Sequence, residues 1–249
     1  MKVGPACIEK PELSSLAIIG DVHSCYHELT QLLELIEKQS STLRTLVFVG
    51  DLIDRGPKPV EVLKLVMQLQ QAGRALSVNG NHDEKLYRWL SGKNVQLWHG
   101  LEFTAEQLKK EPRAFQEQVR RFMADLPFQL ILDNNQLLIA HAGLSERLQK
   151  QDSEAMRSFA LYGDTTGQKD QFGFPVRRDW AKEYSGKRMV VYGHTPLIKP
   201  YWKNNTVNID TGCAFGGKLT ALLYPENEIL HVDAHRKYTE PTKPLQLME

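Results

Sequence analysis

The stretch Phe48-Val49-Gly50-Asp51-Leu52-Ile53-Asp54, followed directly by Arg55-Gly56-Pro57, guides the interpretation of the whole chain. The apolar run 46–49 predicts a buried β-strand, and the charged side chains follow where that strand ends. Ligand-binding groups of α/β proteins commonly lie just beyond the carboxyl ends of strands. We therefore take Asp51 as a candidate metal ligand, Asp54 as a partner of the site and Arg55 as a candidate phosphate clamp.

The bulk composition is that of a soluble globular protein. The 249 residues are 41% hydrophobic and 24% charged, and we expect one domain, 1–249. A net charge of +1 gives no overall field for nucleic acid or membrane, so attraction for anions must be local. Three scattered cysteines and a start without an apolar run predict a cytoplasmic protein, without a disulfide framework or signal peptide.

The first third of the chain repeats one local pattern three times. Apolar strands are expected at 16–19, 46–49 and 75–78, and each is followed by polar residues and then by a helical pattern. Alternation of this kind predicts the α/β class, with strands that share a sheet and bring their polar ends together.

The rest of the chain reads differently. Residues from about 84 to 126 predict a helical insert, and a hairpin follows at 129–140. Residues 163–176, rich in Gly, Asp, Thr and Gln, are expected to form a loop, and residues from about 235 to 249 a polar surface tail. The other predicted strands are 189–192, 206–209, 219–223 and 229–232.

Five predicted strand ends carry side chains of the metal-ligand type. Taken singly, a Gly-Asp pair after a strand is usually a turn, and a lone histidine is usually a surface residue. Together, oxygen and nitrogen donors without a thiolate favour divalent ions such as manganese or iron, and a shared carboxylate such as Asp51 can bridge two ions that hydrolyse phosphate esters. The candidate ligands are Asp21, His23, Asp51, Asn81, His141 and His194, with His82 next to Asn81.

The same residues carry a family resemblance. They form motifs similar, in the same order, to those of the phosphoprotein-phosphatase branch of the calcineurin-like metallophosphoesterases. These motifs are GDVH at 20–23, GDLIDRG at 50–56, GNHD at 80–83, HAG at 141–143 and GHT at 193–195. The stretches 162–167, 175–181, 208–212 and 216–220 resemble, more narrowly, bacterial bis(5′-nucleosyl)-tetraphosphatases.

The resemblance implies a fold and a set of roles. The fold would be a β-sandwich flanked by helices, in four layers, with the helical insert added. One ion would be held by Asp21, His23 and Asp51, and the other by Asp51, Asn81, His141 and His194. A hydroxide bridging the ions would attack phosphorus, His82 would protonate the leaving oxygen with support from Asp54, and Arg55 would grip the phosphate.

Some positions leave alternatives open. Arg177 is a candidate for a second phosphate clamp, with Arg178 as its rival and a solvated loop as the plain alternative. Ser24 stands where the family usually has glycine, and serine would be strained if that position needs a positive φ. Trp89, Trp98, Tyr87 and His99 are candidates for stacking on a base, with a packing role as the alternative.

We expect a hydrolase of dinucleoside polyphosphates such as diadenosine tetraphosphate. The alternatives are a phosphomonoesterase acting on phosphoproteins or on RNA ends with the same site, and a non-catalytic metal- or nucleotide-binding module. His82 with Asp54 argues against the last, because binding alone needs no general acid. Two divalent ions are expected, with Mn²⁺ preferred over Fe, Ni, Co or Zn, and the partner is a small-molecule nucleotide rather than a membrane.

Overall fold

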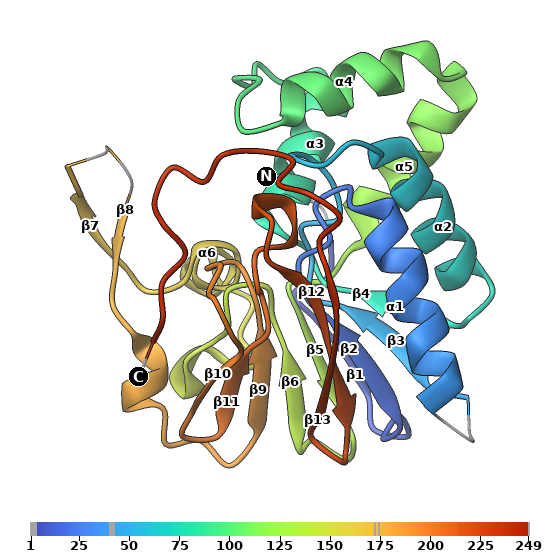
Figure 1. The fold of residues 1–249 in the computed structure, drawn as a ribbon. Helices are drawn as coiled ribbons and strands as arrows, with labels where there is room; N and C mark the ends of the chain where they lie inside the picture. Colours follow the sequence, from blue (N-terminus) through green and yellow to red (C-terminus); the bar gives the residue numbers. More distant parts are fainter. Residues whose placement is uncertain (1–3, 40–42, 172, 174, 249) are drawn as a thin grey trace.

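A computed structural model describes residues 4–39, 43–171, 173 and 175–248. Within them, two mixed sheets pack face to face and helices cover both outer faces (Figure 1). The five-stranded sheet has the order β13-β12-β2-β3-β4, and the six-stranded sheet β1-β5-β6-β9-β11-β10. The strands of the first sheet are β2 (Leu16–Ile19), β3 (Thr45–Phe48), β4 (Ala75–Ser77), β12 (Lys218–Tyr224) and β13 (Glu228–Asp233). Those of the second are β1 (Cys7–Lys10), β5 (Gln129–Leu132), β6 (Leu137–Ile139), β9 (Met189–Tyr192), β10 (Tyr201–Lys203) and β11 (Thr206–Asn208).

The alternation of side chains along each strand produces the layers. Leu16 and Ile18 of β2 pack between the sheets, in a cluster with Ile139 and Val191 of the second sheet. Ala17 and Ile19 of the same strand pack on the outer face of the sheet, against the helices, because successive side chains of a strand leave opposite faces. The four-layer α/β sandwich expected from the resemblance is confirmed.

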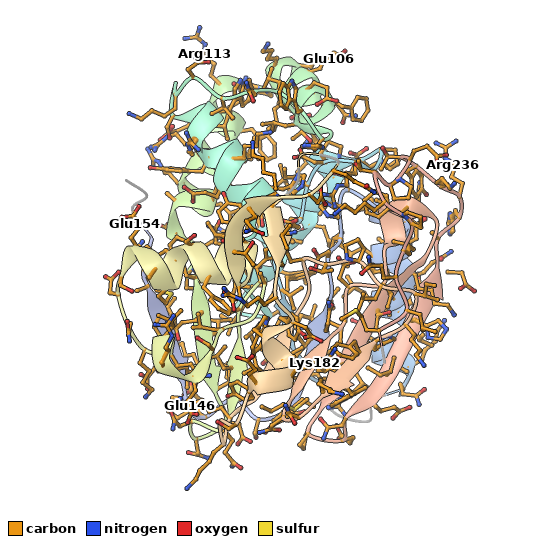
Figure 2. All side chains as sticks on the ribbon, turned by 90° about the vertical axis from the view of Figure 1, so that its left-hand side faces the viewer. Glu106, Arg113, Glu146, Glu154, Lys182 and Arg236 are labelled. Atoms are coloured by element: carbon orange, nitrogen blue, oxygen red, sulfur yellow. The ribbon has the colours of Figure 1, made fainter. Side chains whose placement is uncertain are left out.

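Helices fill the outer layers. The five-stranded sheet is covered by α1 (Tyr26–Gln39) and α2 (Pro59–Gln71), whose apolar faces belong to the same core cluster as Phe48. The six-stranded sheet packs against α6 (Glu154–Tyr162), which faces the viewer in Figure 2 with Glu154 at its start. Short 3₁₀ helices lie at Glu146–Leu148, Trp180–Glu183 and Cys213–Phe215.

The stretch expected as a helical insert contains three helices. They are α3 (Asn81–Leu90), α4 (Leu101–Lys110) and α5 (Arg113–Asp125), and Figure 2 shows Glu106 and Arg113 at the outer end of this cap. The first helix begins at Asn81, so two candidate site residues lie in its first turn.

Residues 163–176 differ from the expectation. In place of a loop, β7 (Thr165–Lys169) and β8 (Pro175–Arg177) pair as an antiparallel hairpin. Both strands are polar and largely solvent-exposed. A hairpin that buries neither face has no apolar alternation for sequence reasoning to detect.

The tail follows a defined path. It is drawn in red in Figure 1 and descends on the side of the β7–β8 hairpin, to which an ion pair between Lys243 and Asp170 ties it. Near its start, the amide of His235 and the hydroxyl of Tyr238 both donate to Glu28 of α1. No helix in the described part of the chain is both long and apolar enough to cross a membrane.

Candidate metal centre

The candidate ligands meet where strands of both sheets end. In the five-stranded sheet, β2, β3 and β4 run parallel, so the residues that follow them emerge at one edge. In the six-stranded sheet, β6 and β9 are likewise parallel, and His141 and His194 follow them. Packing the sheets face to face brings the two edges together, as the strand-end pattern predicted.

Asp51 lies at the middle of the cluster. Its Oδ2 atom is 3.6 Å from His23 Nε2 and 3.5 Å from His141 Nε2. One donor group is His23, Asp51 and His82, the other is Asp51, His141 and His194, and the donor atoms within each lie within 4.8 Å of one another. A single carboxylate shared by two donor groups is the geometry that two neighbouring ions require.

Two further candidates border these groups. Asn81 Oδ1 lies 3.0 Å from His141 Nε2, so it belongs with the second group. Both oxygens of Asp21 accept the backbone N–H of His194, at 3.2 and 3.1 Å. Asp21 therefore links the two sheets, and the compact first group contains His82 where the resemblance implied Asp21.

The histidines present lone pairs to the centre. His23 Nδ1 lies 2.9 Å from the Ile53 carbonyl, and His141 Nδ1 lies 3.0 Å from that of Val49. These carbonyls place the proton on Nδ1, which leaves Nε2 as an acceptor. Burial lowers the pKa of His23, His141 and His194, so the rings stay neutral and able to bind a cation.

This donor set fits divalent cations. His141 Nε2, without a proton, faces Asn81 Oδ1 and His194 Nδ1, both at 3.0 Å, and His194 Nε2 is buried without a hydrogen-bond partner. Burial, with Asp210 and Asp51 close by, raises the pKa of Asp21. Clustered acceptors and buried carboxylates are unfavourable alone, and a cation among them offsets both costs.

His82, Asp54 and Thr104 form a buried relay beside the ligands. His82 Nδ1 lies 2.6 Å from Asp54 Oδ2, and the Thr104 hydroxyl donates to Asp54 Oδ1 at 2.6 Å. Thr104 belongs to α4, so the helical cap contributes directly to this relay. Sequence reasoning missed it, because a threonine 50 residues away carries no motif.

The Arg55 guanidinium occupies the space between the two histidines of the first group. It contacts His23 Nε2, lies 3.0 Å from His82 Nε2 and packs with its CZ atom 5.0 Å from the centre of the Phe215 ring. Its contact with His82 requires a lone pair on Nε2, in agreement with a proton on Nδ1 shared with Asp54.

The backbone is strained around these residues. Positive φ angles occur at Ser24 (60°), Asp51 (49°), Asp54 (72°) and Arg55 (67°), a region that side chains other than glycine rarely adopt. Ser24 thus takes the strained conformation foreseen if serine replaced glycine there, and its buried hydroxyl has no hydrogen-bond partner.

Asp83 and Asp210 are two buried carboxylates that sequence reasoning did not assign to the site. Asp83 accepts the amides of Leu52 and Gly80, both at 3.1 Å, and so braces two ligand loops. Burial raises the pKa of Asp83 to about 8 and that of Asp210 to about 6. Polar residues stand beside both aspartates in the sequence, at Glu84 and Thr211, so the local pattern did not indicate that these carboxylates are buried.

The two arginines at the end of β8 have different partners. Arg177 Nε donates to the Tyr162 carbonyl at 2.6 Å, and its charge helps to lower the pKa of His194. Arg178 forms an ion pair with Asp164, at 3.2 Å. Of these two arginines, both of which line the cleft, Arg177 is therefore the one whose charge acts on a candidate ligand, while Arg178 is paired with Asp164.

The centre opens into a cleft of about 1270 Å³. We call the six candidate ligands the floor. We call the start of α4, the β7–β8 hairpin and the tail 235–248 the rim, since all three border the cleft. Cationic side chains of the rim and its surroundings include Arg177, Arg178, Arg236, Lys237 and Lys243.

Comparison with known proteins identifies the family. The calcineurin-like phosphoesterase model matches residues 14–198. Bis(5′-nucleosyl)-tetraphosphatase PrpE [asymmetrical] of Anoxybacillus flavithermus is 46% identical over 232 residues, covering 89% of this chain and 95% of the relative. The enzyme of the same name from Bacillus subtilis is 43% identical over 237 residues, covering 90% and 96%.

Solved structures agree on the fold. One described as "Crystal structure of a putative diadenosine tetraphosphatase" superposes with a TM-score of 0.70 at 24% identity, covering 92% of this chain and 98% of the other. A protein serine/threonine phosphatase from Saccharomyces cerevisiae gives 0.62 at 16% identity, covering 96% and 85%. The family model spans most of the chain, and the floor lies at the strand ends within it. The chain therefore belongs to the calcineurin-like phosphoesterase family and is a phosphohydrolase.

Proposed function

We propose that this phosphohydrolase cleaves dinucleoside polyphosphates such as diadenosine tetraphosphate at a centre of two divalent ions. The observation that carries the chemistry is the shared Asp51 carboxylate between two donor groups. The substrate class is supported by relatives named bis(5′-nucleosyl)-tetraphosphatase that align over about nine-tenths of both chains. A wide cleft lined by the guanidinium groups of Arg55, Arg177 and Arg236, on a chain of net charge +1, supports local attraction of a polyanion.

The proposed ligands divide around Asp51. Asp21, His23 and Asp51 would hold one ion, and Asp51, Asn81, His141 and His194 would hold the other, with Mn²⁺ as the preferred metal. When bound, such ions polarise a phosphoryl oxygen and lower the pKa of water so that it can attack phosphorus.

The remaining residues handle the phosphate and the proton. When substrate binds, the Arg55 guanidinium turns from the Nε2 atoms of His23 and His82 to the phosphate, and its two N–H groups donate to two phosphate oxygens. His82 Nε2 is then free to carry a proton, which it donates to the leaving nucleotide oxygen. Asp54 stabilises the charged imidazole through Nδ1, and Arg177 is the second phosphate contact.

The setting of this activity is also proposed. We propose that residues 1–249 act as one domain, with α3–α5 and the tail as additions to the sandwich. The three cysteines are free thiols, which supports a reducing cytoplasm as the place of action.

The test compares substrates on one preparation. Chelator-treated protein is resupplied with Mn²⁺, Fe²⁺, Co²⁺, Ni²⁺ or Zn²⁺ and offered diadenosine tetraphosphate, a phosphoserine peptide and p-nitrophenyl phosphate. We expect metal-dependent hydrolysis with the highest kcat/KM for the dinucleotide. A much higher kcat/KM for the peptide would contradict the proposed substrate, and full activity without metal would contradict the centre.

A further inference from the structure

An open aromatic ring borders the cleft beside the phosphate clamp. The side chain of Phe103, in the first turn of α4, is 41% exposed and lines the cleft together with Arg55, His82 and His99. Single exposed apolar side chains are common on protein surfaces, so exposure alone does not indicate a function. The way the chain holds this ring is what distinguishes it.

The chain contacts the loop that carries Asp54 and Arg55 on both sides of Phe103, at Gly100 and at Thr104. Gly100 has a φ of 98°, and a Cβ atom there would lie 2.2 Å from the backbone nitrogen of Arg55, so the two backbones are in close contact. One residue beyond Phe103, the Thr104 hydroxyl donates to Asp54. These two anchors hold the backbone on either side of Phe103 close to the loop that carries Arg55, while Phe103 itself stays exposed to the cleft.

Trp98 provides a contrast on the same segment. It is 59% exposed, and its carbonyl accepts a hydrogen bond from Lys85. Of these two exposed aromatic side chains, Phe103 lines the cleft and Trp98 does not. Among these exposed aromatic residues, the candidate for base stacking is therefore Phe103, which the sequence did not suggest, rather than Trp98.

We propose that Phe103, with His99 beside it, is the stacking site for the nucleobase whose phosphate Arg55 grips. This rests on the proposed function and deepens it, since it assigns one end of the dinucleotide to the cap side of the cleft. In a nucleotide, base and phosphate are joined through one ribose, so an aromatic ring on a turn anchored to the Arg55 loop can meet the base of the nucleotide whose phosphate Arg55 holds. Every base has a π face, so stacking recognises a base without selecting among bases.

The test uses two inhibitors that differ only by the base. AMP and ribose 5-phosphate are measured as inhibitors of p-nitrophenyl phosphate hydrolysis, a reaction that involves no base. From the usual strength of base stacking we expect AMP to bind the wild type about tenfold more tightly than ribose 5-phosphate. Phe103→Ala should remove this preference, whereas Phe103→Trp should keep it and the matched Trp98→Ala should leave it unchanged.

The outcomes separate this proposal from the preceding one. Equal inhibition of the wild type by both compounds, or a preference for AMP that survives in Phe103→Ala, overturns the stacking site. Hydrolysis of diadenosine tetraphosphate by the wild type is measured apart and tests only the proposed function. If Phe103→Ala loses p-nitrophenyl phosphate activity, its folding is at fault, and Phe103→Leu, which keeps an apolar side chain but has no π face, takes its place. Loss of the AMP preference in Phe103→Leu with p-nitrophenyl phosphate activity intact supports the site, and an AMP preference that survives in Phe103→Leu overturns it.

Discussion

The floor and the rim of the cleft are built in opposite ways. The floor residues follow short strands of two packed sheets, and Asp51, His141 and His23 are buried. The rim consists of a helix start, a polar hairpin and the C-terminal tail, where Phe103 and Arg177 remain accessible. Rigid strand ends hold the groups that must be placed accurately for chemistry, whereas loops and additions on the scaffold provide recognition.

The largest expected effect is a floor substitution. Asp51→Asn removes the shared charge, so we expect kcat on p-nitrophenyl phosphate to fall by about a thousandfold or more and the bound metal to be lost. Elemental analysis and steady-state kinetics measure both. The matched control is Asp233→Asn, an exposed aspartate paired with Lys218, which should keep both properties. Unchanged metal content in Asp51→Asn would refute the bridging role.

Substitution of His82, the proposed general acid, tests protonation of the leaving oxygen without removing a proposed metal ligand. We expect His82→Ala to lower kcat on phenyl phosphate by about a hundredfold or more, since general acid catalysis contributes on that scale. The loss should be smaller with p-nitrophenyl phosphate, whose leaving group needs less help from a proton. Equal losses on both substrates would show that His82 does not protonate the leaving oxygen.

Thr104 joins helix α4 of the rim to Asp54 beside the floor, so its substitution should lower kcat less than substitution of Asp51 or His82. Thr104→Val keeps the shape but removes the hydrogen bond to Asp54, so we expect kcat to fall by about tenfold or less with KM unchanged. Because Thr104 acts through Asp54 and His82 as a positioning residue, Thr104→Val should lower kcat more with phenyl phosphate than with p-nitrophenyl phosphate. Thr104→Ser should restore kcat, and a loss that is the same for both leaving groups would indicate only structural damage.

The smallest effect concerns Asp210, a buried carboxylate beside the floor residue Asp21. Burial raises the pKa of Asp210 from 3.8 to about 6, so the folded state holds a proton that the unfolded chain releases between these pH values. Stability of the metal-free protein should therefore fall as pH rises through this window. Asp210→Asn should raise the free energy of unfolding by roughly 1–3 kcal/mol at pH 8 and leave it unchanged near pH 4, as measured by urea unfolding.

The rim supplies the contrast for this measurement. Lys237 and Glu240 form an exposed ion pair on the tail, and such pairs contribute little. Lys237→Ala should therefore leave the unfolding free energy nearly unchanged at both pH values. A gain for Asp210→Asn that persists at pH 4 would show that its buried charge is not the cause.

Much of the site could be predicted because its signals are local. Each floor residue follows an apolar run that forms a strand, and Asp54, Arg55 and His82 stand within a few residues of those ends. The hairpin at β7–β8 was missed because it buries neither face. Phe103 was missed because nothing in its neighbourhood in the sequence distinguishes an open ring from a packed one.

The amino-acid sequence by itself determined the α/β class, the family resemblance and the order of the floor residues, since strand periodicity and motifs are read over a few neighbouring positions. Only the tertiary structure decided that Thr104 supports Asp54, that Asp210 lies beside Asp21, and that the rim presents Phe103 to the cleft. These contacts join residues far apart in the chain. They depend on how two sheets and a helical cap pack together, which no local pattern specifies.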